Sequence, residues 1–285
     1  MKNYLVINQF YNAKSFETVY GALQNAFAEF GEELEIITNV QARGLLTVNG
    51  KGAPVLFFDK DVNLAKLLEK AGYRCVNNSF VIETCDDKSK TYLALKDNFL
   101  MPKTILAPFC YDGVKYSSYE FLEEMGEELG YPLIVKENKG SFGAQVYKVN
   151  DINELENLVK GFNHCQFLLQ EFVETSVGKD LRVYVVGGKA VAYAQRYNEN
   201  DFRSNINFGG SMVKVEIESK YTACAEEVAK ALGADFCGID LLFGNDDPLV
   251  CEVNSNAQFN ALSETTGVNV AKEIVKYFLA LKNKN

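Results

Sequence analysis

The sequence predicts an α/β protein, and two observations support this. In the first third of the chain, apolar runs of strand length alternate with segments of helical periodicity. Further along, apolar runs flank short turn-forming segments, which is typical of antiparallel hairpins. With 285 residues, 47% hydrophobic and 24% charged, the chain is long enough for two or three packed lobes.

The first lobe is predicted to contain a parallel sheet. Strands are predicted at 4–10, 34–40 and 54–58, with helices at 15–30 and 62–71 that end at Gly31 and Gly72. This alternation predicts a small parallel α/β lobe up to about residue 84. The turn at 8–12 has no G-x-G-x-x-G pattern, so we do not expect nicotinamide dinucleotide binding.

The rest of the chain mixes helices and strands. A new unit begins with a helix over 86–96 and a strand at 104–106. The further helices that we predict are 119–129, 152–162 with Asp151 as its cap, 223–232 and 268–282. The further strands flank the loop 139–143 and occupy 167–173, 181–186, 190–196, 236–243 and 249–253.

Composition excludes several classes of protein. No apolar run approaches the roughly 20 residues of a membrane span, and no signal pattern opens the chain, so we expect a cytoplasmic protein. The net charge of −9 argues against general nucleic-acid binding. Seven cysteines without C-x-x-C spacing indicate reduced thiols rather than disulfides or zinc. The only histidine, His164, is expected to be a surface or capping residue.

The hairpin over 236–254 carries the strongest chemical signal. With 244–248 as its loop, Phe243 would lie opposite Leu249 and Asp240 opposite Glu252, on one face. Asn254 returns to that face, so the set supplies only oxygen ligands, which suits Mg²⁺. The alternative is a solvated acidic face, but near-continuous apolar flanks favour the metal site.

A second signal lies in the segment 133–149. Lys136 sits in an apolar strand, and the loop 139–143 carries two glycines whose backbone N–H groups could close over phosphates. A plain exposed hairpin explains the same residues equally well. The connector at 174–178 could read a heterocycle or be an ordinary crossover, and Arg182, Arg196 and Arg203 stand where strands end, as anion clamps would.

Taken in order, these segments resemble one family. They are Lys136, the loop 139–143, 170–173, 180–182, 201–205, Gly209-Gly210, 238–240 and 252–254. This series is similar to ATP-grasp ligases of the RimK type, the group that contains ribosomal-protein glutamate ligases and lysine-biosynthesis carrier-protein ligases. The resemblance covers roughly residues 86–280, and FRSN at 202–205, EVN at 252–254 and TTGVNVA carry it.

The resemblance implies an ATP-grasp fold of three lobes: a parallel α/β lobe at 1–86, a central lid lobe at 87–170 and a C-terminal antiparallel-sheet lobe at 171–285. It implies ATP and Mg²⁺, or Mn²⁺ in its place. The implied nucleotide-binding residues are Lys88, Lys136, Ser141, Gln170, Glu171, Phe172, Val173 and Asp180, and the metal ligands are Asp240, Glu252 and Asn254. Arg203, Asn205 and Arg196 would face the acyl substrate and its phosphate.

The expected activity is ATP-dependent joining of a carboxylate to an amine through an acyl phosphate. The substrates would be small molecules or peptides, and a homo-oligomer is compatible with the sequence. Phe208 stands where relatives that add acidic amino acids often carry a basic residue, which puts glutamate in doubt. A non-catalytic ATP-sensing module is the alternative, and FRSN disfavours D-alanine:D-alanine ligase or biotin carboxylase types.

Overall fold

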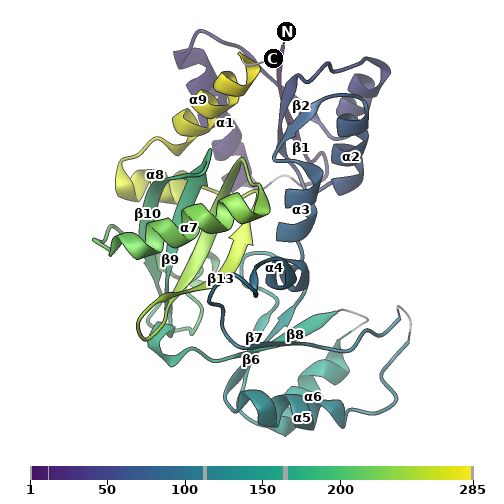
Figure 1. The fold of residues 1–285 in the computed structure, drawn as a ribbon, viewed down its shortest axis with the longest axis vertical. Coiled ribbons are helices and arrows are strands. Elements are labelled where there is room, and N and C mark those ends of the chain that lie inside the picture. The colour runs from purple at the N-terminus through teal and green to yellow at the C-terminus, as the bar shows by residue number, and fades with distance from the viewer. Residues whose placement is uncertain (1, 12, 112–113, 163–165, 284–285) are drawn as a thin grey trace.

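The chain folds around three β-sheets that follow one another along the molecule (Figure 1). The computed structural model describes residues 2–11, 13–111, 114–162 and 166–283. His164 therefore lies outside the described residues. Within those residues, no helix has the length and apolar character needed to cross a membrane.

The first sheet is parallel, with strand order β2-β1-β3-β4. Its elements are β1 (Asn3–Ile7), α1 (Lys14–Glu29), β2 (Leu34–Thr38), the 3₁₀ helix η1 (Gln41–Thr47), β3 (Pro54–Phe58), α2 (Val62–Lys70) and β4 (Arg74–Val76). Every residue of β3 is buried, as expected for a parallel strand covered on both faces. Helix α2 begins at Asp61, whose side chain accepts a hydrogen bond from the Leu64 N–H.

Two short helices connect the first sheet to the second. They are α3 (Ser79–Cys85) and α4 (Lys88–Leu95), capped by the side chains of Asn78 and Asp87. The predicted helix at 86–96 is thus present, whereas β4 and α3 were not predicted. Asn78 and Asp87 are the signals that mark the two helix starts in this segment.

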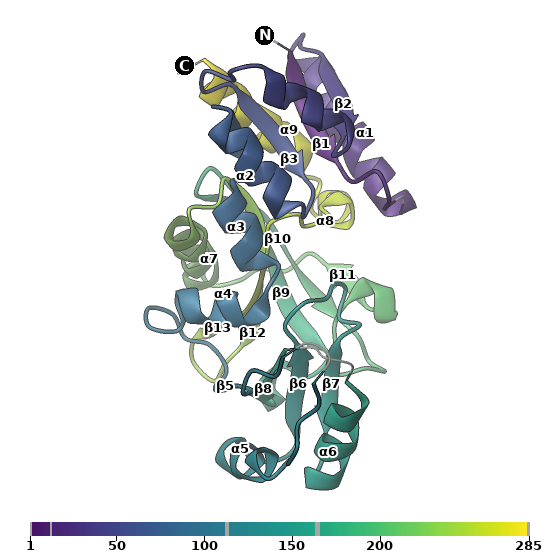
Figure 2. The ribbon, with the colours of Figure 1, turned by 90° about the vertical axis from the view of Figure 1, so that its right-hand side faces the viewer.

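The central sheet is antiparallel, with strand order β5-β8-β6-β7. Its strands are β5 (Thr104–Leu106), β6 (Leu133–Glu137), β7 (Val146–Val149) and β8 (Phe167–Glu171). Helices α5 (Phe121–Leu129) and α6 (Ile152–Gly161) share a separate apolar core with this sheet and lie together at one end of the molecule (Figure 2). The central lobe therefore packs internally without help from the other two sheets.

The third sheet has strand order β11-β10-β9-β12-β13 and is antiparallel throughout. Its strands are β9 (Lys179–Val186), β10 (Lys189–Tyr197), β11 (Ser211–Val213), β12 (Phe236–Phe243) and β13 (Pro248–Asn254), and short 3₁₀ helices lie at η2 (Glu174–Ser176) and η3 (Ile206–Phe208). Helix α7 (Ser219–Leu232) shares one core with the sheet, and α8 (Asn260–Thr266) and α9 (Val270–Lys282) share another.

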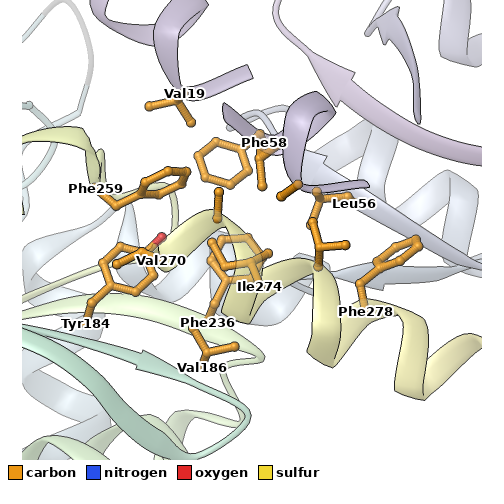
Figure 3. Packing of buried hydrophobic residues seen from close by; sticks show 14 of the residues in the cluster. Val19, Leu56, Phe58, Tyr184, Val186, Phe236, Phe259, Val270, Ile274 and Phe278 are labelled. Atoms are coloured by element: carbon orange, nitrogen blue, oxygen red, sulfur yellow. The ribbon is translucent and has the colours of Figure 1, made fainter. Parts of the chain in front are cut away.

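One apolar core joins the first and third sheets (Figure 3). Phe58 of β3 stacks on Phe236 of β12 with ring centroids 5.3 Å apart. Phe27 of α1 meets Phe278 of α9 edge to face at 5.5 Å, so the last helix packs onto the first lobe. The lobe limits near residues 86 and 170 remain a prediction, but this shared core makes the first and third sheets one packed body.

Asn77, which follows β4, links these two sheets through hydrogen bonds. Its side chain is fully buried and donates to the carbonyl oxygens of Phe236 and Ser255 at 2.8 and 3.1 Å. Its carbonyl oxygen accepts from the N–H groups of Asp235 and Phe236 at 2.8 and 3.3 Å. One buried amide thus satisfies four backbone groups of the third lobe.

Asn77→Ala should lower the free energy of unfolding by about 2–4 kcal/mol, because four buried backbone groups lose their hydrogen bonds to this side chain. Urea unfolding followed by circular dichroism measures the change. Asn98→Ala is the matched control, because Asn98 is exposed and should change stability by about 0.5 kcal/mol or less. Equal midpoints for the two variants would contradict the role of Asn77.

Candidate functional site

The β12–β13 hairpin pairs Asp240 with Glu252, as predicted from the sequence. The register of the hairpin next to its turn differs from the prediction. Phe243 lies opposite Pro248 rather than Leu249, because Pro248 already belongs to β13. A register shift next to Asp240 leaves Cys251 as an extra residue, and this bulge restores the predicted pair.

Asp240 is engaged by two arginines. Its carboxylate is almost fully buried and is held by Arg182, directly opposite on β9, through two hydrogen bonds, one of 2.9 Å from Nη2. Arg196 reaches the same carboxylate at 2.9 Å and also binds Asp180 through Nε at 2.7 Å. The four side chains form a buried network with two negative and two positive charges.

The network fixes the charge states of its members. Burial alone would raise the pKa of Asp240, but Arg182 and Arg196 outweigh it and hold the pKa below its ordinary value. Burial would likewise lower the pKa of Arg196, and Asp180 and Asp240 outweigh it, so the pKa is raised. Asp240 and Arg196 are therefore held in their charged forms inside the sheet.

Glu252 and Asn254 differ from Asp240 because their side chains have no hydrogen-bonded or ion-paired partner within the described chain. Both are half-buried, and no hydrogen bond or ion pair is made by either side chain among the described residues. The two lie two positions apart on one strand and so share a face. Free carboxylate and amide oxygens fit a hard divalent cation, whereas Asp240 could join them only by giving up a guanidinium.

A pocket opens beside Glu252 and is lined by two lysines. Its walls include Lys88 from α4, Lys136 and Gln170 from the central sheet, and Cys251 and Glu252 from β13. Lys136 is only 8% exposed, and among the described residues its ammonium group has the Cys251 sulfur as its hydrogen-bond partner, at 3.5 Å. A buried ammonium group without a carboxylate partner is suited to binding an anion from outside the chain.

Lys88 is in a similar position. Burial lowers its pKa, and the nearby Glu252 carboxylate only partly offsets that effect. In the part of the chain that the structure describes, its ammonium group makes no hydrogen bond or ion pair. Lys88 and Lys136 thus bring two ammonium groups without carboxylate partners into one pocket.

Apart from Ser141, which lies in the loop 139–143, the other predicted nucleotide-binding residues lie at the end of β8 and at the start of β9. The Glu171 N–H donates to the Lys103 carbonyl at 2.9 Å, and the Phe172 ring lies 4.2 Å from the Lys148 ammonium. The Val173 carbonyl accepts from the Ser176 N–H. Of the predicted set, the structure gathers Lys88, Lys136 and Gln170 in the pocket, while Asp180 is bound by Arg196.

The loop 139–143, called the glycine loop below, touches the segment that carries Arg203. Gly140, Phe142 and Gly143 have positive φ angles of 152°, 62° and 79°. Arg203 Nη1 donates to the carbonyls of Gly143 and Val146 at 3.0 and 3.3 Å. A Cβ at Gly143 would lie 2.7 Å from Asn205 Oδ1, so this close approach needs glycine.

Two other residues complete the surroundings of Arg203. Asp201 accepts from Arg203 Nε at 3.0 Å and from Nη2 at 2.8 Å. The Phe208 ring covers the guanidinium plane, 3.5 Å from its carbon to the ring centroid. The predicted catalytic residues are thus divided between two places: Arg203 and Asn205 lie against the glycine loop, and Arg196 lies inside the buried charge network.

Sequence reasoning missed Lys60 and Cys251. Lys60 follows β3 and reaches the glycine loop, and the signal that could have found it is its place at the carboxyl end of a parallel strand, where ligands gather. Cys251 lines the pocket because of the bulge. No residue pattern in the hairpin marks that bulge, so the sequence held no signal for it.

Arg196→Met should cost about 3–5 kcal/mol of stability, because Asp180 loses its guanidinium and Asp240 keeps only one. Adding Asp180→Asn should recover part of the loss by removing one unpaired charge. Chemical unfolding of the two variants measures this. Lys66→Met removes only an exposed pair with Glu83 and should cost about 1 kcal/mol or less. If all three variants unfold at one midpoint, the network does not stabilise the sheet.

Comparison with known proteins places this chain in a family. The model of the RimK-like ATP-grasp domain matches residues 85–278, which is more than half of the chain. A probable alpha-L-glutamate ligase from Maridesulfovibrio salexigens is 32% identical over 231 residues, 79% of this chain and 73% of that protein. Human N-acetylaspartylglutamate synthase A is 34% identical over 232 residues, 80% of this chain and 58% of that protein.

A solved structure supports the fold independently of sequence. D-alanine–D-alanine ligase from Bacillus anthracis complexed with ATP superposes with a TM-score of 0.76 at 16% identity, over 100% of this chain and 98% of that one. The predicted α/β architecture and the predicted family are therefore both confirmed. This chain belongs to the RimK-like ATP-grasp family.

Proposed function

We propose that this protein is an ATP-dependent carboxylate–amine ligase that forms an amide or peptide bond through an acyl phosphate and releases ADP and phosphate. One observation carries the proposal. Lys136 is buried and Lys88 half-buried, neither makes an ion pair within the described residues, and they line one pocket together with Glu252. A polyphosphate chelated to a divalent cation would pair with both ammonium groups and would bring a cation to the Glu252 carboxylate.

The nucleotide would lie between the central and third sheets. Lys88 and Lys136 would hold phosphate oxygens, and the glycine loop with Ser141 would cover them. Gln170 and the main chain of Glu171, Phe172 and Val173 would meet the adenine, and Asp180 the ribose. Asp180 could accept from a ribose hydroxyl while it keeps Arg196, because each carboxylate oxygen has more than one acceptor site.

Glu252 and Asn254 would hold Mg²⁺, or Mn²⁺ in its place, with Asp240 as the third ligand. Arg182 and Arg196 both bind Asp240, and Arg196 has Asp180 as a second partner, so one guanidinium can leave Asp240 without losing its own carboxylate. Bound there, the cation would neutralise phosphate charge during phosphoryl transfer.

The reaction needs positioning and charge compensation rather than a covalent enzyme intermediate. A carboxylate oxygen of the acid attacks the γ-phosphorus, and the bond to the β–γ bridging oxygen breaks, which releases ADP. The amine nitrogen then attacks the acyl carbon, phosphate leaves, and the amine proton passes to water. Arg203 and Asn205, with Arg196, would stabilise the oxygens that gain charge.

The substrates would be a small-molecule or peptide carboxylate and an amine. Relatives are named for glutamate ligation and for synthesis of N-acetylaspartylglutamate, so an amino acid is the first amine to test. Phe208 covers the guanidinium face of Arg203 with an apolar ring, and this favours acceptors other than glutamate at that point. A cytoplasmic location, no nucleic-acid or membrane partner, and a homo-oligomer complete the proposal.

The alternative is a module that senses ATP without catalysis. Such a module needs the lysines and the metal ligands but not Arg203 and Asn205 against the glycine loop. ADP release, measured across a panel of acids and amino acids with mass spectrometry of the products, separates the two. ATP binding without any product from the panel would favour the sensor.

Arg203→Ala should lower kcat by about 10²–10³-fold, because a positioned donor is lost where charge develops. Calorimetric affinity for Mg-ATP should change far less. Arg43→Ala is the control, because Arg43 is exposed in η1, far along the chain from the site. An unchanged kcat in the Arg203 variant would remove this residue from the mechanism.

Glu252→Gln should raise the Mg²⁺ concentration needed for half-maximal nucleotide binding by about tenfold or more, because one anionic ligand of a hard cation becomes neutral. Titration of Mg²⁺ at fixed ATP, followed by calorimetry, gives the value. Glu216→Gln is the matched control, because it removes an exposed charge between β11 and α7. Identical Mg²⁺ dependence in both variants would exclude a metal at Glu252.

A further inference from the structure

Lys60 brings the first lobe into contact with the glycine loop. It follows β3 and Asp59 at the carboxyl edge of the parallel sheet, a region in which ligands of such sheets gather. Its ammonium group donates to Ser141 Oγ at 3.1 Å, across 81 positions of sequence. Ser141 is therefore held by a residue from another lobe.

The same ammonium group is anchored by Asp86, at the start of the segment that leads into α4. Lys60 is 45% and Asp86 23% exposed, so this ion pair by itself adds little to folding. It does, however, fix where the Lys60 side chain points. Asp86 thus orients the ammonium group, and Ser141 is what the group reaches.

The glycine loop accepts hydrogen bonds from residues of two other lobes. The first lobe holds it at Ser141 through Lys60, and the third lobe holds it at Gly143 through Arg203, 3.0 Å from the carbonyl. The backbone between these two points has positive φ angles at Phe142 and Gly143, which is a costly arrangement for the phenylalanine. The hydrogen bonds from Lys60 and Arg203 offset this cost and stabilise the observed conformation of the loop.

Lys60 also lies within electrostatic reach of the pocket. Its charge contributes to lowering the pKa of Lys88, as does that of Lys136. Three lysines, one from the first lobe, one from α4 and one from the central sheet, therefore act on the same region. Nothing in the sequence pattern of the phosphate site points to the first of them.

We propose that Lys60 is a positioning residue for the phosphate end of the nucleotide: by holding Ser141, it keeps the glycine loop closed over the site. The proposal rests on the proposed function for its nucleotide but can be tested without turnover. Lys60 acts through Ser141 and is not itself placed on the reacting atoms.

Trypsin cleavage after Lys139 reports on opening of the loop, because Lys139 is an exposed residue at its start. Lys60→Met should speed this cleavage about tenfold in the nucleotide-free protein and with Mg²⁺ and a non-hydrolysable ATP analogue, since one hydrogen bond to a charged group is lost. Ser141→Ala should match it. The double variant should be no faster than either single one, because both changes remove the same contact.

Three further variants separate positioning from a structural role. Lys60→Arg keeps a donor and should restore slow cleavage. Lys70→Met removes an exposed lysine of α2 and should leave cleavage unchanged. Asp86→Asn removes the charge of the ion pair, but its amide oxygen can still accept from the Lys60 ammonium group and orient it, so its cleavage rate should stay within threefold of the parent. If Asp86→Asn reproduces Lys60→Met, the effect comes from the ion pair and the proposal is overturned.

Kinetics provide the second measurement. Lys60→Met should raise KM for ATP about tenfold while kcat changes less than threefold, since the contact closes the site rather than stabilising developing charge. A chain that releases no ADP with any substrate would overturn the proposed function and leave the cleavage comparison intact. Equal cleavage rates for Lys60→Met and the parent would overturn the role of Lys60 whatever the activity.

Discussion

The third sheet depends on buried ion pairs between its strands. Arg182 and Asp240 face each other across β9 and β12, while Arg196 of β10 closes the set by binding Asp180 and Asp240. Ions inside a sheet are costly unless they are paired with good geometry, so the strands cannot slide by one residue without leaving charges alone. The network thereby fixes the register of β9, β10 and β12, and β13 with Glu252 and Asn254 pairs with the last of these strands.

Among the described residues, some buried or half-buried charged side chains form ion pairs and others do not. In the network, each carboxylate meets a guanidinium, and burial is compensated from within the chain. Lys136, which is buried, and Lys88, which is half-buried, make no ion pair within the described residues. This contrast distinguishes paired charges, which stabilise the fold, from two lysines that the described chain does not pair, and it is visible only once the strands are placed.

The sequence predicted the larger elements and much of the site. Strongly periodic segments such as α1, α6 and α9, and the buried strand β3, were found close to their observed limits, because amphipathic periodicity and buried apolar runs are local signals. The pairing of Asp240 with Glu252 was also predicted. Strand β4, helices α3 and α8, and the bulge at Cys251 were missed, since they are short and depend on tertiary contacts.

The same limit applies to the functional residues. Lys88, Lys136 and Gln170 were expected near a nucleotide and do line one pocket. The binding of Asp240 by two arginines could not be predicted, because no local pattern states which strand lies next to β12. Lys60 was missed for a related reason: its partner Ser141 is far along the chain, and only the packed lobes bring the two together.

The shared core of the first and third sheets sets what can move. Phe58 with Phe236, and Phe27 with Phe278, lock those two sheets into one body, whereas the central sheet keeps its apolar core to itself. Two backbone crossings connect that separate piece, and they are joined where Lys103 and Glu171 exchange hydrogen bonds. Beyond these crossings, hydrogen bonds such as those from Lys60 and Arg203 hold the glycine loop, so turning the middle third of the chain as a unit would break polar contacts but would leave each apolar core whole.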